Sequence, residues 1–133
     1  MSIEYINPPA AWDSQPRSYS HVVKVVSPKA LYFVAGAAAV DKHINVLHIG
    51  DIEGQARLVF QHIQRDLEAA GASLADVVDM TVYLRDKNHQ WPVRNVRKEF
   101  FEEGRFPVST MIEVKDFCLE GMLIEVDVIA ATV

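Results

Sequence analysis

The chain has little of several features that mark particular classes of protein. It contains one cysteine, Cys118, among 133 residues, so no disulfide can form within the chain, which fits a reducing compartment. Its longest strongly apolar stretch, Leu31 to Val40, is about half the length of a membrane-spanning helix. No signal-peptide pattern opens the chain at Met1. We therefore expect a soluble, cytoplasmic protein with no membrane partner.

An excess of basic charge is also missing. The chain has 13 Lys and Arg against 18 Asp and Glu, a formal net charge of −5, and no basic run. A nucleic-acid partner is therefore not expected, because such proteins carry a positive footprint for phosphates. The densest basic cluster is Arg94, Arg97 and Lys98, and it lies among glutamates. Mixed charges of this kind favour a solvated helix face.

Metal-ligand patterns and the common catalytic signatures are absent. His43 and His48 precede the main predicted helix and His62 lies on it, without the spacing of a zinc site. There is no nucleophile elbow, P-loop or dinucleotide fingerprint. The lone Cys118 is not favoured as a nucleophile, because incidental thiols are far commoner than activated ones. We expect no metal and no cofactor.

What the chain does contain is an alternation of strand and helix patterns. Half of its residues are hydrophobic and 23% are charged, and its length fits a single domain over 1–133. A helix is predicted over 51–70, with Asp51 as N-cap and Gly71 beyond its end, and a shorter one over 90–103, with Pro92 in its first turn. Strands are predicted at 3–6, 19–26, 31–37, 77–84, 108–114 and 122–130, the second and third forming a hairpin.

This order, β-β-β-α-β-α-β-β, indicates an α+β fold with a mixed sheet and both helices on one face. The other face of the sheet then has no cover within the chain. If that face is apolar, further subunits must cover it, so the order of elements itself favours oligomerisation.

The last predicted strand carries acids on one of its two faces. Ile124 and Val126 point one way, while Glu125 and Asp127 point the other, because successive side chains alternate along a strand. One interpretation is a solvated sheet face with ion pairs. The other is a carboxylate in a partly buried cleft that takes part in proton transfer.

Several segments together carry a resemblance to a known family. In order and spacing they resemble the YjgF/Rid family, from about Tyr19 onward: LEAAGASLADVV at 67–78, YLRD at 83–86, Asn95 with the FF pair at 100–101, FP at 106–107 and IEVDVIA at 124–130. The resemblance implies a chorismate-mutase-like fold. It also implies a homotrimer with a barrel-like core and small-molecule ligand clefts between its subunits.

The resemblance also implies a chemistry. Deaminating members of that family hydrolyse enamines and imines such as 2-aminoacrylate, releasing ammonia and a 2-oxo acid without metal or organic cofactor. The corresponding pocket here has Tyr19, the backbone at Gly36, Asn95, and Glu125 as the carboxylate that positions or activates water. Tyr19 can equally be a core aromatic residue whose hydroxyl reaches solvent, and Asn95 can be an amide on the helix surface.

The chain departs from the deaminases at the residue that holds the substrate carboxylate. Where they read Pro-x-Arg-Ser, this chain has Ser109, with Met111 further along the same strand as a second expected substrate contact. A serine hydroxyl cannot replace a bidentate guanidinium. Arg17, in the loop just before Tyr19, is either a substitute for the missing substrate-binding arginine or an exposed loop residue.

Three functions therefore stand side by side. The first is hydrolytic deamination of an enamine or imine other than 2-aminoacrylate, and the second is a non-catalytic ligand-binding or regulatory trimer. The third is the endoribonuclease activity often attached to the family, which the acidic composition disfavours.

Overall fold

The computed structural model describes all 133 residues and has the element order that the sequence predicts. Helix α1 is capped by Asp51, whose side chain accepts a hydrogen bond from the backbone N–H of Gly54 at 3.0 Å. Gly71 follows the helix with a φ of +91°, where a side chain would be strained. The elements are β1 Ser2–Ile6, β2 Val22–Val26, β3 Ala30–Ala37, α1 Ile52–Ala69, β4 Val77–Leu84, α2 Gln90–Phe100, β5 Val108–Glu113 and β6 Ile124–Thr132.

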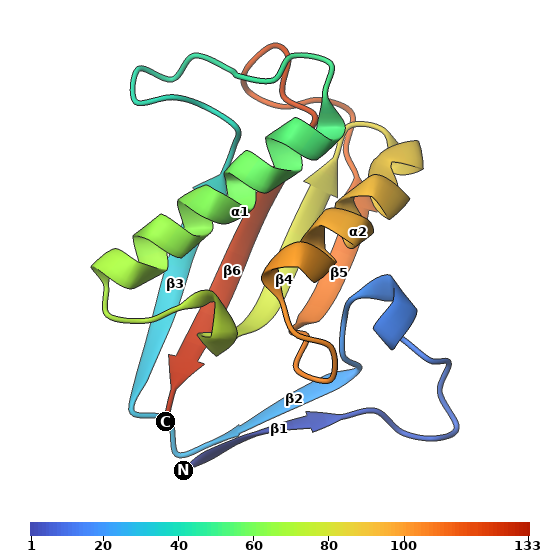
Figure 1. Ribbon diagram of the computed structural model, residues 1–133, viewed down its shortest axis with the longest axis vertical. Helices are drawn as coiled ribbons and strands as arrows, with labels where there is room; N and C mark the ends of the chain where they lie inside the picture. The colour runs from blue at the N-terminus through green and yellow to red at the C-terminus, as the bar shows by residue number, and fades with distance from the viewer.

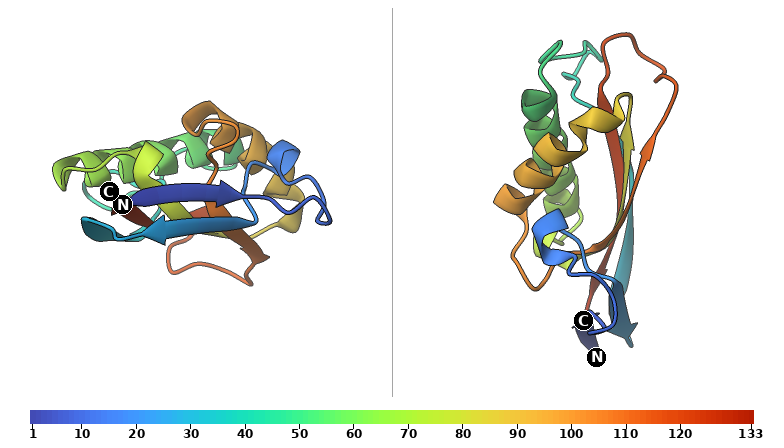
Figure 2. Two further views of the ribbon diagram at one scale, coloured as in Figure 1. Left: turned by 90° about the horizontal axis from the view of Figure 1, so that it is seen from below. Right: turned by 90° about the vertical axis from the view of Figure 1, so that its right-hand side faces the viewer.

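The main sheet has four strands in the order β3-β6-β4-β5 (Figure 1). Strands β4 and β5 are parallel and the other pairs are antiparallel, so the sheet is mixed. Both helices lie on one side of it, as the edge-on view in Figure 2 shows. The predicted α+β fold with two helices on one face is therefore confirmed.

The predicted hairpin of the second and third strands is wrong. Strand β2 begins at Val22 and pairs with β1 in a separate two-stranded sheet, while β3 pairs with β6. The reason lies at the two ends of β2. After the Ser27-Pro28 break, Lys29 N–H already donates to Thr132 O at 2.7 Å, and before the strand Ser20 N–H donates to Pro107 O at 3.0 Å. The β1–β2 pair thus runs from the start of β3 towards β5.

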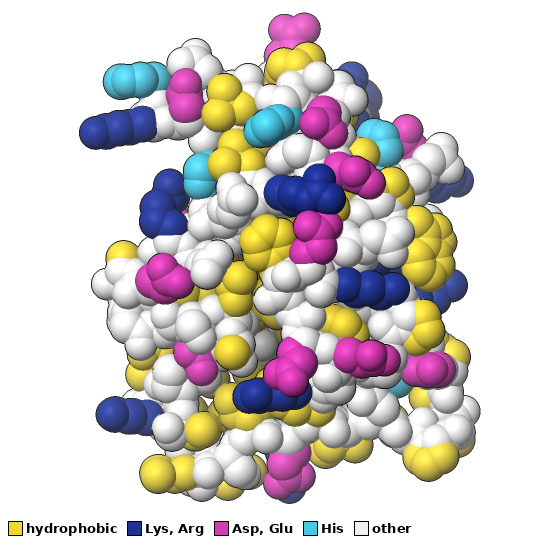
Figure 3. Space-filling view, viewed as in Figure 1, with side chains coloured by type: hydrophobic (Ala, Val, Ile, Leu, Met, Phe, Trp, Pro, Cys, Tyr) yellow, Lys and Arg dark blue, Asp and Glu magenta, His cyan; other side chains and the backbone are white.

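The core lies between the two helices and the inner face of the sheet. Phe60 on α1 is fully buried and its ring lies 5.3 Å from Phe100 and 6.0 Å from Phe101. The inner residues of β6, such as Ile124 and Val126, are also fully buried. Over the helices the surface carries interspersed basic and acidic side chains (Figure 3).

The outer face of the sheet has no cover in this chain. Phe33 on β3 is 74% exposed, and Leu31 and Ile112 are also exposed. Large apolar side chains gathered on one open sheet face are typical of an interaction surface. Neither helix is long and apolar enough to cross a membrane.

Candidate functional site

Glu125 lies on the open face of the sheet, near its centre. It occupies β6 opposite Tyr83 on β4, and both side chains are half-buried. Tyr83 donates its hydroxyl hydrogen to Asp127 Oδ2 at 3.2 Å. The charge of Asp127 raises the pKa of Tyr83, so this tyrosine remains a neutral donor. Asp127 therefore has a partner, whereas Glu125 presents its carboxylate to the open face.

Gly36 lies directly against this carboxylate. The register of β3 and β6 shifts between Val34 and Ala37, where the strand bulges. A Cβ atom on Gly36 would lie 2.9 Å from Glu125 Oε1 and 3.1 Å from its Cδ. Such distances are shorter than ordinary van der Waals contact. The absence of a side chain at Gly36 thus makes room for Glu125, and the structure brings together these two predicted site residues.

A hollow of about 410 Å³ adjoins Glu125 on the same face. Its wall includes Tyr83 from β4 and, from the loop between β5 and β6, the half-buried Phe117 and the exposed Cys118. The lining is mostly hydrophobic, and its two acidic residues are Glu125 and the exposed Asp116. It can receive a small molecule beside the carboxylate.

Tyr19 and Arg17 lie in a different place, beside α2 and the start of β5. The Tyr19 hydroxyl accepts a hydrogen bond from Trp12 Nε1, and its ring lies 5.8 Å from the ring of His21. The Arg17 guanidinium lies 5.4 Å from the centre of the Trp91 ring on α2. The N-terminal loop is thereby held against the second helix.

Ser109 and Met111 lie on the face of the sheet that the helices cover. Ser109 pairs with Met80 of β4, whose side chain is fully buried in the core, and neighbouring residues in register share a face. Arg97 Nη1 donates to Ser109 Oγ at 2.7 Å. Glu125 points to the opposite face, so within one chain Ser109 and Glu125 cannot line the same cleft.

The prediction that Arg94 and Arg97 lie on a solvated helix face is wrong. Arg94 is 8% exposed and Arg97 is 1% exposed, whereas Lys98 is exposed as predicted. The two arginines flank the apolar stripe of Val93 and Val96 on the inner side of α2, where the N-terminal loop packs over them. Their spacing of three residues, next to that stripe, was the sequence signal that could have placed them there.

Asn95 lies on the exposed side of α2. It is one residue away from Arg94, and because a helix turns by about 100° per residue the two side chains point in different directions. The side chain that α2 directs towards Tyr19 and β5 is Arg94, which was not among the predicted site residues.

The histidines remain apart from one another. His62 Nε2 lies 2.8 Å from the Val40 carbonyl oxygen, and the ring of His48 lies near its helix-capping neighbour Asp51. No group of three or more His, Cys, Asp or Glu side chains converges in a geometry that could hold a metal ion.

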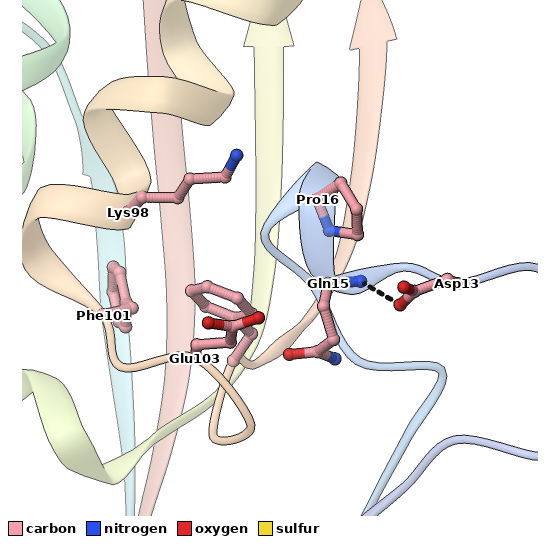
Figure 4. Close-up of a pocket in the computed structure, with 7 residues that line it drawn as sticks. Asp13, Gln15, Pro16, Lys98, Phe101 and Glu103 are labelled. Atoms are coloured by element: carbon pink, nitrogen blue, oxygen red, sulfur yellow. Dashed lines mark hydrogen bonds between the residues drawn. The ribbon is translucent and has the colours of Figure 1, made fainter.

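A second hollow, of about 310 Å³, lies between the N-terminal loop and the end of α2 (Figure 4). Lys98, Glu103, Asp13 and Gln15 line it. The backbone N–H of Gln15 donates a hydrogen bond to Asp13 Oδ1 at 3.0 Å. It contains none of the predicted site residues, and its charged groups are of both signs.

The fold and the open-face carboxylate define an α+β protein with a ligand-sized hollow on the uncovered side of its sheet. Residues 13–132 match the family described as Endoribonuclease L-PSP. The chain belongs to this family, and the resemblance to YjgF/Rid proteins is confirmed.

Individual relatives agree with this membership. A RutC family protein of Pyrococcus abyssi is 38% identical over 112 residues, covering 84% of both chains. The 3-aminoacrylate deaminase RutC of Acinetobacter baylyi is 33% identical over 84 residues, covering 63% of this chain and 66% of its own. The structure of the Rid-family protein YyfB from Yersinia pestis has a TM-score of 0.90 at 25% identity, covering 98% of this chain and 99% of its own.

Proposed function

We propose that this protein is a cytoplasmic, cofactor-independent hydrolase that deaminates a small enamine or imine, with Glu125 as the catalytic residue. The observation that carries the proposal is the Glu125 carboxylate beside the bare backbone of Gly36, at the edge of a hollow on the open sheet face. The deaminase activity of a relative named 3-aminoacrylate deaminase supports the class of reaction.

The chemistry needs one group that can move a proton in both directions. Glu125 accepts a proton from water as the water oxygen bonds to the imine carbon. It then returns that proton to the nitrogen, which gives a carbinolamine. A second proton passes through Glu125 from the carbinolamine hydroxyl to the nitrogen as the carbon–nitrogen bond breaks, so that ammonia leaves and the carbonyl product forms. One water is consumed for each ammonia released, so no redox partner or metal is required for balance.

The pocket is completed, in this proposal, by a second copy of the chain in a homotrimer. Glu125 faces the open side of the sheet, whereas Tyr19, Arg17 and Ser109 lie at the α2 and β5 edge. A neighbour that sets this edge on the open sheet face joins the two groups and covers the exposed Phe33. In that cleft Tyr19 orients substrate, with Met111 and the backbone of Gly36 as further contacts.

The test is a comparison of two isosteric changes on the same strand. Glu125→Gln removes the proton acceptor, so the turnover of imino acids made in situ by an amino-acid oxidase should fall about a hundredfold or more. Asp127→Asn is the matched control, because Asp127 is already held by Tyr83 and lies one step further along the same face. Equal activity in Glu125→Gln and the unmodified protein would sink the proposal.

The alternative is a non-catalytic ligand-binding trimer. The position of Ser109 favours it, because its hydroxyl is already bound by Arg97 and does not replace the family's substrate-binding arginine. This alternative predicts that small oxo acids bind but that no enamine or imine is hydrolysed faster than in buffer.

A further inference from the structure

Three of the seven arginines have no acidic partner, and all three lie together. The other four each form an ion pair with a carboxylate: Arg57, Arg65, Arg85 and Arg105. Arg17, Arg94 and Arg97 form none, although the chain as a whole has an excess of acids. Arg94 and Arg97 are buried, whereas Arg17 is exposed. Buried charges without compensation are costly, and proteins normally pair them. This concentration of unpaired positive charge on α2 and the N-terminal loop therefore needs an explanation.

Arg97 is the structural member of the group. Its Nε donates to Ser18 Oγ at 2.9 Å, its Nη2 to Arg17 O at 2.9 Å and its Nη1 to Ser109 Oγ at 2.7 Å. Burial, and then the neighbouring charge of Arg94, lower the pKa of Arg97 to about 9. It therefore remains a cation at neutral pH, and it adds positive potential to the site while its own donors are occupied.

Arg94 is the arginine of this group whose hydrogen-bond donors are not all used. Its Nη1 donates to Gln90 Oε1 at 2.6 Å, but its Nε is buried and has no hydrogen-bond partner. The guanidinium carbon lies 5.1 Å from the centre of the Trp91 ring, the same ring that the Arg17 guanidinium approaches. Stacking on an indole fixes the plane of a guanidinium and leaves its edge available to a ligand.

The space beside Arg94 is small and open to solvent. A hollow of about 60 Å³ adjoins it, with Met111 on β5 and Glu113 further along the strand. Glu113 forms no ion pair with Arg94; its carboxylate accepts a hydrogen bond from the backbone N–H of Lys87 at 2.7 Å, and Lys87 adds a second cation to the lining. The local balance of charge remains positive, and the hollow suits a group of a few atoms.

We infer that Arg94, assisted by Arg17 on the same Trp91 ring, binds the carboxylate of a small oxo or imino acid. Arg94 thus supplies from helix α2 the bidentate contact that Ser109 cannot make, and Arg97 supports it from beneath. A bound carboxylate offsets the uncompensated cations. The inference rests on the proposed function for the class of ligand, but the site itself follows from the unpaired arginines.

Equilibrium binding tests the inference without requiring turnover. Pyruvate is titrated by calorimetry into the unmodified protein, Arg94→Gln, Arg94→Lys and the control Arg105→Gln, an exposed arginine paired with Glu102. We expect Arg94→Gln to weaken binding about tenfold or more. Arg94→Lys, which keeps the charge but loses the fork, should give an intermediate result, and the control should match the unmodified protein. Pyruvamide, which is uncharged, should bind poorly to all four.

Two results would overturn the inference. One is pyruvate binding that is unchanged in both Arg94 variants while each remains folded by circular dichroism. The other is equal binding of pyruvamide and pyruvate, which shows that no cation reads the carboxylate. If binding depends on Arg94 but Glu125→Gln turns over imines normally, the anion site stands and the catalytic proposal fails. If binding does not depend on Arg94 but Glu125→Gln abolishes turnover, the catalytic proposal stands and the anion site fails.

Discussion

Replacing Gly36 by alanine tests whether the position of Glu125 matters independently of its chemistry. The new Cβ would lie 2.9 Å from Glu125 Oε1, 3.1 Å from Cδ and 3.3 Å from Cγ. Ordinary contacts of this kind are about 3.5–4.0 Å, so the carboxylate must move by roughly 0.5–1 Å. Displacements of about 1 Å at a reacting group can cost about a hundredfold in rate. We expect Gly36→Ala to lower kcat/KM about ten- to a hundredfold.

The same change should leave the fold almost as stable as before. Gly36 does not have a positive φ, so alanine fits its backbone and gains about 0.4–1 kcal/mol through the unfolded chain. Moving Glu125 off its preferred rotamer costs about 0.5–1.5 kcal/mol. The two effects nearly cancel, and the midpoint of thermal unfolding should shift by no more than about 4 °C.

The assay is ammonia release from imino acids made in situ, measured beside thermal unfolding. The double variant Gly36→Ala with Glu125→Gln is the control, since alanine should cause no further loss once the carboxylate is gone. Full activity in Gly36→Ala at unchanged stability would refute the reasoning, because the carboxylate would then tolerate displacement. An additional loss in the double variant would show that Gly36 acts through something other than Glu125.

Four further outcomes follow from the same structure. Phe60→Ala should lower the free energy of unfolding by about 3–5 kcal/mol in urea titrations, because its fully buried ring packs on two phenylalanines. Arg97→Met should speed tryptic cleavage after Arg17, followed by mass spectrometry, since the bonds that hold the N-terminal loop on α2 are lost. Phe33→Asp should convert the proposed trimer to smaller species in light scattering, because it charges the exposed face. Activity should persist in a metal chelator, measured with the ammonia assay, because no ligand grouping is present.

The helices and most strands could be predicted because their signals are local. The apolar periodicity after Asp51 and the glycine at 71 define α1 to within a residue or two, and alternation along 77–84 defines β4 at both ends. The pairing of β2 could not be read in this way. A strand of alternating valines fits either β1 or β3, and the choice depends on the contacts of Lys29 and Ser20 with distant residues.

The site could be predicted in part. The alternation of the last strand separated Glu125 from the apolar Ile124 and Val126, and the family resemblance supplied Gly36. The structure places Glu125 on the open face with Gly36 against it. The arginines were missed because charged residues in a mixed cluster are usually solvated. Here, the N-terminal loop covers Arg94 and Arg97, and the only local signal of that burial was their position beside Val93 and Val96 on the helix.

The most direct test of the account is complementation between two inactive variants. If one chain supplies Glu125 and its neighbour supplies Arg94, then Glu125→Gln and Arg94→Gln trimers are each poorly active alone. Unfolded together and refolded in equal amounts, they form mixed trimers in which about a quarter of the clefts have both native residues. We expect recovery of about a quarter of the unmodified activity in the ammonia assay. No recovery above the separate variants, in trimers shown by mass spectrometry to be mixed, would contradict a cleft shared between subunits.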